Sequence, residues 1–206
     1  MKPDAPTLTT GPAPPLIEVC MLRDNLAGEP LLHTLPPAGY SLRPYQPGDS
    51  ATWVRVHQRA EPYHHVDDAL FQREFGGDQA LLAQRQLFLC DAQGEAVGVA
   101  TAWVPQPERP TRLGRVHWVA IAREHQGRGL MLPLVAALCR RFLELGHSGA
   151  YLTTESLRLV AIRGYLRLGF TPELRHAADR AAWREVLAQG VPLPAETCAL
   201  LAQATR

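Results

Sequence analysis

The sequence lacks the features that mark secreted, membrane and nucleic-acid-binding proteins. It has no run of about 18 apolar residues, which argues against a membrane-spanning helix, and its start does not have the charge and apolar pattern of a signal peptide. Its net charge of +1 argues against a dedicated nucleic-acid binder. No Cys-x-x-Cys pair occurs, and we interpret the four cysteines as free thiols: Cys20, Cys90, Cys139 and Cys198. We therefore expect a cytoplasmic protein with neither a nucleic-acid nor a membrane partner.

What is present indicates an ordinary globular chain. Apolar residues make up 46% and charged residues 20% of the 206 positions, which favours one domain with a real core. Residues 1–15 are rich in proline, threonine and alanine and cannot bury a core. We predict a flexible tail over 1–15 and a single domain over 16–206, with no internal repeat.

The most informative stretch is residues 116–145. Residues 116–121 are β-branched and aromatic and predict a strand, which is followed by a turn with two glycines. A helix is predicted next, and Gly146 stands where its left-handed cap belongs. The apolar residues at helical spacing are Met131, Val135, Leu138, Phe142 and Leu145.

A strand, a glycine turn and a helix together form a binding site for phosphates. The first turn of a helix has unpaired N–H groups whose dipole favours negative charge, and glycine lets a ligand approach the backbone. Arg128 adds a positive charge beside Gly127 and Gly129. The turn fits neither a P-loop, since it has no Gly-Lys-Ser/Thr, nor a dinucleotide-binding Gly-x-Gly-x-x-Gly. We interpret it as a pyrophosphate cradle.

The spacing Gln126-x-x-Gly129 resembles the acetyl-CoA signature Arg/Gln-x-x-Gly-x-Gly/Ala of the GNAT N-acetyltransferase superfamily. Met131 departs from it, because glycine or alanine is usual there. A second run, Ala161-x-x-x-Tyr165-x-x-x-Gly169-Phe170, is similar to the family pattern Asn-x-x-Ala-x-x-x-Tyr-x-x-x-Gly-Phe. Two motifs in the right order are much more specific than either alone.

The second run also departs from the family pattern. Arg158 replaces the usual asparagine, and Gly164 replaces a larger apolar residue at a cost of about 1 kcal/mol to the helix relative to alanine. We expect this helix over 157–168, with Ser156 as its N-cap and Gly169 as its stop.

The resemblance implies an α/β (α+β) GNAT fold with its core motifs in 98–174. Its mixed, twisted central sheet is flanked by helices, and the cofactor cleft lies between two splayed parallel strands, here 116–121 and 150–154. The sequence also predicts strands over 16–22 and 41–45, a hairpin of 87–90 with 96–104, and helices over 49–60, 68–75, 78–84 and 179–189. Many family members have a final hairpin strand where 179–189 is helical.

The resemblance implies acetyl-CoA as co-substrate. The backbone of Val119, Ala120 and Ile121 would pair with the pantetheine arm and polarise the thioester carbonyl. The turn would hold the pyrophosphate through Gln126, Gly127, Arg128, Gly129, Leu130 and Met131.

Two side chains are candidates for catalysis. Tyr165 matches the family tyrosine near the sulfur of CoA, and a phenol can protonate a thiolate; the alternative is a core tyrosine. His117, which the alternation places on the same face as Arg115 and Val119, can accept a proton as general base, or can simply pack within the sheet. Some family members place a catalytic glutamate at position 115, so that mechanism does not carry over to Arg115.

The acceptor pocket is expected around the loop that follows the first helix and at the end of strand 150–154. Its candidate residues are Glu61, Tyr63, His64, His65 and Glu155. The His64-His65-x-Asp67-Asp68 run also invites a metal, but it has no partner cluster elsewhere, so we predict no metal site. A solvated polar loop is the alternative.

These observations favour an acetyl-CoA-dependent N-acetyltransferase acting on a primary amine of a small molecule or peptide. With no positioned cysteine nucleophile, direct attack in a ternary complex is expected. The alternatives are a non-catalytic acyl-CoA-binding module, an acyltransferase using a longer acyl-CoA, and a nucleotide-binding α/β protein. The identity of the acceptor, and whether the protein is a monomer or a homodimer, stay open.

Overall fold

The computed structural model describes residues 17–27, 33–60 and 64–203. The predicted tail 1–15 and the candidates Glu61 and Tyr63 lie outside the described residues. The strands are β1 Glu18–Arg23, β2 Ser41–Pro44, β3 Gln86–Cys90, β4 Ala96–Trp103, β5 Leu113–Ile121, β6 Gly149–Glu155 and β7 Thr171–Pro172. The helices are α2 Asp49–Ala60, α3 Asp68–Phe75, α4 Gln79–Arg85, η1 Arg123–His125, α5 Met131–Glu144, α6 Leu159–Arg167, α7 Ala177–Ala188 and α8 Ala195–Ala202.

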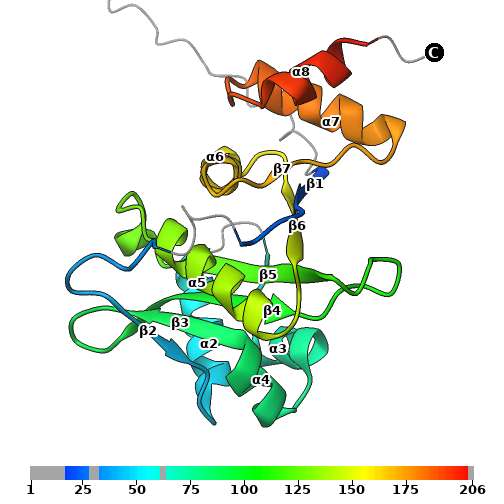
Figure 1. Cartoon of the computed structure of the whole chain (residues 1–206). Helices are drawn as coiled ribbons and strands as arrows, with labels where there is room; N and C mark the ends of the chain where they lie inside the picture. Colours follow the sequence, from blue (N-terminus) through cyan, green and yellow to red (C-terminus); the bar gives the residue numbers. More distant parts are fainter. Residues whose placement is uncertain (1–16, 28–32, 61–63, 204–206) are drawn as a thin grey trace, which may run out of the picture.

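The described strands form one mixed sheet in the order β2-β3-β4-β5-β6-β1-β7. The β5–β6 pair is parallel and the other pairs are antiparallel. In Figure 1, α5 crosses one face of the sheet, α2, α3 and α4 lie on the other, and α7 and α8 lie beyond β1 and β7. The predicted mixed α/β sheet flanked by helices is confirmed.

Two apolar clusters follow from this layering. The larger gathers one face of the sheet against α5, whose Val135, Leu138 and Phe142 are buried as the helical spacing predicted. The smaller gathers the opposite face against α2 and α3, around Trp53 and Phe71. Each face of the central strands is therefore buried under helices.

The N-terminal strand occupies an unexpected place. The sequence predicts a short strand over 16–22, and β1 lies between β6 and β7, antiparallel to both. β1 therefore takes the place beside β7 that a hairpin strand following β7 would take. The chain after β7 forms helix α7 instead. Leu26 is fully buried just beyond β1, and its N–H donates to the Ser148 carbonyl at 3.0 Å.

The predicted N-cap of α6 is wrong. The helix begins at Leu159, with Arg158 in the cap position and no side-chain cap. Ser156 is buried, its hydroxyl has no hydrogen-bond partner, and its N–H donates to the Ile17 carbonyl at 2.7 Å. Ser156 therefore belongs to the junction with β1. The predicted stops are confirmed, because Gly146 and Gly169 have φ of 83° and 77°.

Among the described residues, no helix is both long enough and apolar enough to cross a bilayer.

Candidate active site

The central parallel pair opens into a cleft. β5 and β6 pair only over Leu113–Arg115 and Gly149–Tyr151, although both strands continue. Beyond Arg115 the facing backbone groups of the two strands are therefore not joined by ladder bonds. This is the predicted split between parallel strands.

A β-bulge lies at the start of this split. His117 pairs with Thr101 and Ala120 with Val99, so Trp118 and Val119 together oppose one residue of β4. Trp118 has φ of 49°, in the left-handed region. Such a bulge turns backbone groups away from the ladder.

The bulge corrects the expectation that His117 and Val119 share a face. His117 packs against Phe75, with ring centroids 5.6 Å apart, and so lies on the α2–α3 side together with Trp118. Val119 packs into the cluster under α5. Regular alternation fails here because two consecutive side chains point the same way.

The glycine turn has the geometry expected of a cradle. Gly127 and Gly129 have φ of 75° and 73°, and the space beside each is open. The side-chain amide of Gln126 donates to the Ile121 carbonyl at 2.9 Å and ties the turn to β5. Helix α5 starts at Met131, and Leu130 offers no side-chain cap. Leu132 donates to the Gly129 carbonyl at 3.2 Å and Pro133 has no N–H, so in the first turn it is the N–H of Met131 that is left for a ligand.

Arg128 lies beside this turn without a carboxylate partner among the described residues. It donates to the Tyr40 hydroxyl at 2.9 Å and to the Glu124 carbonyl at 3.2 Å. The Tyr40 hydroxyl also lies 3.0 Å from Nδ1 of His125. Neutral partners hold the guanidinium in place and leave its charge uncompensated, which suits an anionic ligand.

The two departures in the motifs meet in space. A Cβ on Gly164 would lie 2.9 Å from Sδ and 3.1 Å from Cε of Met131. The glycine in α6 therefore makes room for the long side chain at the start of α5. The sequence showed both departures but not that they compensate each other.

A cavity of about 290 Å³ at the split brings together the described candidates for catalysis and acceptor binding, except His65. Its polar lining comes from β1, β5, β6, α2, α3, α6 and the segments that precede α3 and α6. Of the predicted residues it includes His64, His117, Val119, Glu155 and Tyr165. The others that line it are Glu18, His57, Glu74, Arg115, Val116, Trp118, Thr153, Thr154, Arg158 and Ala161.

His117 is held by an acidic partner. Its Nε2 lies 3.1 Å from Oε2 of Glu74, which also accepts from Nε1 of Trp118 at 3.0 Å. Burial lowers the pKa of His117, and Glu74 offsets part of that effect. The hydrogen bonds from His117 and Trp118 lower the pKa of Glu74 to about 2. A neutral imidazole beside a carboxylate therefore has its proton on Nε2 and its lone pair on Nδ1.

Glu155 is engaged on both carboxylate oxygens. Oε1 lies 3.0 Å from Nε2 of His64, and Oε2 accepts from Nε of Arg158. Burial opposes ionisation, but these hydrogen bonds outweigh it and keep the pKa of Glu155 below its usual value. His65 lies outside the cavity, 88% exposed and 3.4 Å from Asp67.

Tyr165 closes the α6 side of the cavity. The side chain is 6% exposed, its ring packs edge-on against Phe170 at 5.8 Å, and burial raises its pKa. The phenol is therefore protonated at neutral pH. In the part of the chain that the structure describes, no group of three or more histidine, cysteine, aspartate or glutamate side chains is placed to hold a metal ion.

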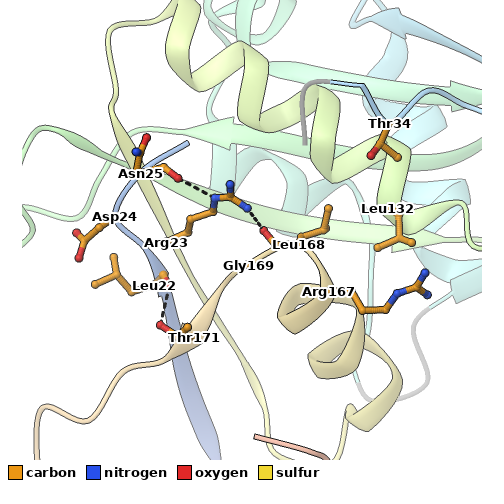
Figure 2. A pocket seen from close by; sticks show the side chains of 10 residues that line it. All are labelled: Leu22, Arg23, Asp24, Asn25, Thr34, Leu132, Arg167, Leu168, Gly169 and Thr171. Carbon is orange, nitrogen blue, oxygen red and sulfur yellow. Dashed lines mark hydrogen bonds between the residues drawn. The ribbon is translucent and has the colours of Figure 1, made fainter. Parts of the chain in front are cut away.

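A larger cavity of about 670 Å³ lies elsewhere, beside the ends of β1 and α6 (Figure 2). Arg23 crosses it, donating from Nε to the Asn25 carbonyl at 2.8 Å and from Nη1 to the Leu168 carbonyl. That guanidinium fills the space beside Gly169. None of the predicted site residues lines this cavity. We therefore interpret it as a junction between β1 and α6, and not as the place where the reaction occurs.

The architecture is thus a mixed sheet that opens between two parallel strands beside a glycine turn. The model of the acetyltransferase (GNAT) family matches residues 50–170, more than half of the 206-residue chain. The chain therefore belongs to the GNAT acetyltransferase family.

The chain is also similar to curated proteins named mycothiol acetyltransferase. The mycothiol acetyltransferase of Amycolatopsis mediterranei is 33% identical over 158 residues, which cover 73% of this chain and 50% of the relative. That of Streptomyces griseus is 29% identical over 157 residues, covering 75% and 50%. The chain spans about half the length of these relatives.

Solved structures share the fold. A GCN5-related N-acetyltransferase from Sphaerobacter thermophilus has a TM-score of 0.59 at 18% identity, covering 76% of this chain and 48% of that one. A GNAT acetyltransferase from Colwellia psychrerythraea has a TM-score of 0.59 at 12% identity, covering 77% and 53%. At these identities the likeness supports the fold alone.

Sequence reasoning missed Glu74, Trp118 and His57 in the cavity. Glu74 was only one position of a predicted helix, and it reaches His117 from 43 residues away. Trp118 enters through the bulge. No local pattern marks either residue, because tertiary packing alone brings them to the site.

Proposed function

We propose that the chain is an acetyl-CoA-dependent N-acetyltransferase that acts on a small-molecule amine by direct attack in a ternary complex. The observation that carries the proposal is the split between β5 and β6. The uncapped start of α5 lies at one end, and the buried His117 with its half-buried partner Glu74 lies in the adjoining cavity. Acetyl-CoA fits the open glycine turn and the uncompensated Arg128, and it supplies an activated thioester.

The chain's own residues supply proton transfer. Nδ1 of His117 takes a proton from the attacking amine, while Glu74 fixes the tautomer and stabilises the imidazolium. Tyr165 gives its proton to the departing thiolate. Glu155 is a poorer base than His117, because both of its oxygens are already engaged, one by His64 and one by Arg158.

The cysteines argue against a covalent acyl-enzyme. Burial raises the pKa of Cys20 and of Cys139 to about 12, and burial also raises that of Cys90. Cys198 lies on α8, and no cysteine lines the cavity. Attack by the amine itself is the simpler route.

The first test combines binding and turnover. Acetyl-CoA and CoA at about 100 times Kd should add about 2.7 kcal/mol of stability and raise Tm, whereas ATP and NAD should not. A series of amines then tests turnover by release of CoA. Binding without turnover, and no effect of Tyr165→Phe, would support a non-catalytic module. Faster reaction with propionyl-CoA would support a longer-chain acyltransferase, and stabilisation by ATP or NAD alone would support a nucleotide-binding protein.

Variants test the assignment of the base. His117→Asn should lower kcat by about 10²- to 10⁴-fold and leave the acetyl-CoA Kd unchanged. His65→Asn, exposed and outside the cavity, is the matched control. In the parent, kcat/KM corrected for the neutral fraction of the acceptor amine should rise with pH and level off below pH 6.5, because the pKa of His117 is lowered. Glu74→Gln removes a partner that raises this pKa, so the inflection should move to lower pH.

A further inference from the structure

The cavity contains one arginine that forms neither a hydrogen bond nor an ion pair within the described part of the chain. Arg115 lines it from β5, and no hydrogen bond or ion pair joins its side chain to another described residue. Its Nε is buried and unpaired. The residue is half-buried, and an anion bound there would pair with this unpartnered donor.

Three carboxylates line the cavity with Arg115, and none of them forms an ion pair with it. Oε2 of Glu74 accepts from both His117 and Trp118, and the two oxygens of Glu155 are taken by His64 and Arg158. Glu18 is exposed at the start of β1. Arg158 is thus paired with Glu155. The charge of Arg115 acts on Glu74 without a direct contact, so its N–H donors are left for a ligand.

Arg115 lies in line with the reacting groups along β5. Arg115 pairs with Trp103 of β4, and His117 pairs with Thr101, two residues away on the same strand, before the bulge begins. They therefore share a face about 7 Å apart along the strand. A molecule whose amine lies at His117 would place a carboxylate on the neighbouring carbon within reach of the guanidinium.

We propose that Arg115 binds the carboxylate of the acceptor and that the acceptor is an α-amino acid or a similarly compact amine with a free carboxylate. This inference rests on the proposed function. A guanidinium matches a carboxylate with two parallel N–H donors, which fixes orientation as well as affinity. The acceptor then enters from the α2–α3 side, with its amine between Arg115 and the bulge.

The test uses matched acceptors. With acetyl-CoA fixed, kcat and KM are measured for a series of α-amino acids and for the corresponding amino acid amides. The free acids should be preferred by about 10- to 100-fold in kcat/KM, mainly through KM. Amidation lowers the pKa of the amine and so supplies more of its reactive neutral form. A preference for the acids therefore runs against intrinsic reactivity.

Variants assign the preference to one side chain. Arg115→Gln should raise KM for the acids and leave the amides unchanged, so that the two series become equal within about 3-fold, and Arg115→Lys should restore part of the preference. Arg55→Gln, an exposed position on α2, is the matched control and should keep the parent preference. Equal use of acids and amides by the parent, or a preference that survives Arg115→Gln, would overturn the inference.

A binding measurement separates this inference from the proposed function. Calorimetry on the CoA-loaded protein compares N-acetyl-α-amino acids with their amides. Tighter binding of the acids by the parent, lost in Arg115→Gln, supports the carboxylate site even if no amine is acetylated, in which case the proposed function alone fails. Equal binding of acids and amides by the parent overturns the site.

Discussion

Replacing Gly164 with alanine tests whether the two departures in the motifs compensate each other. Alanine is better than glycine inside a helix by about 1 kcal/mol. The added Cβ, however, would lie 2.9 Å from Sδ of Met131, too close for the present position of the thioether. Moving this flexible end off its rotamer costs about 0.5–1.5 kcal/mol. The two effects nearly cancel, so Gly164→Ala should change the free energy of unfolding by less than about 0.5 kcal/mol.

A double-mutant cycle separates the gain in helix propensity from the cost of moving the Met131 side chain. In a Met131→Ala background the obstruction is gone, and Gly164→Ala should then stabilise the protein by the full propensity gain of about 1 kcal/mol. The coupling energy should equal the cost of moving Met131, about 0.5–1.5 kcal/mol. Urea denaturation measures it as a change in midpoint at constant slope. An equal gain in both backgrounds, within about 0.3 kcal/mol, would refute the compensation. Gly77→Ala in the Met131→Ala background is the control and should be additive, since nothing lies within 4 Å of its added Cβ.

Two further predictions concern stability. Gly114→Ala should cost at least about 2 kcal/mol in the free energy of unfolding, because its Cβ would lie 2.1 Å from the buried ring of Phe142. Asp49→Asn should cost about 1–3 kcal/mol at pH 7, because Asp49 accepts two hydrogen bonds from Arg43 at 2.5 and 2.9 Å. Despite burial, these bonds lower the pKa of Asp49, so its contribution is complete above the usual value of about 3.9 and is lost as the pH falls below it.

Denaturation curves check both predictions. Gly77→Ala is the control for the first, since it adds the same methyl group in open space. A Gly114→Ala protein as stable as its parent would contradict the close packing of α5 on β5. For the second, the difference between parent and Asp49→Asn should narrow as the pH is lowered from 5 to 2. A constant difference would show that the charge of Asp49 does not contribute.

The elements that could be predicted are those whose own residues determine them. The apolar spacing of α5 and the glycine at its end gave the correct helix and stop. The β-branched run of β5 gave a correct strand, three residues short at its start. The split between β5 and β6 was implied by the resemblance of two motifs and is present in the pairing.

What could not be predicted depends on contacts between distant residues. The place of β1 between β6 and β7 is decided by a sheet edge that forms about 130 residues later in the chain. Ser156 has the residue type of an N-cap, yet the pairing of its N–H with Ile17 draws it into the β1 junction. Glu74 and Arg115 line one cavity because α3 lies beside β5 in the fold, and no local pattern predicts that arrangement.

The bulge at Trp118 is required by the two clusters on either side of the sheet. Val116 packs under α5 and Ala120 under α2, but in a regular strand residues four apart point to the same face. One extra residue must be inserted between them, and the structure inserts it directly after His117. Arg115 and His117 therefore keep one regular face for the cavity, while the chain beyond the bulge has the alternation that leads into the glycine turn. The bulge thus separates the part of β5 that carries Arg115 and His117 from the part that leads to the glycine turn. Removing one residue there would turn one of these two parts to the wrong face.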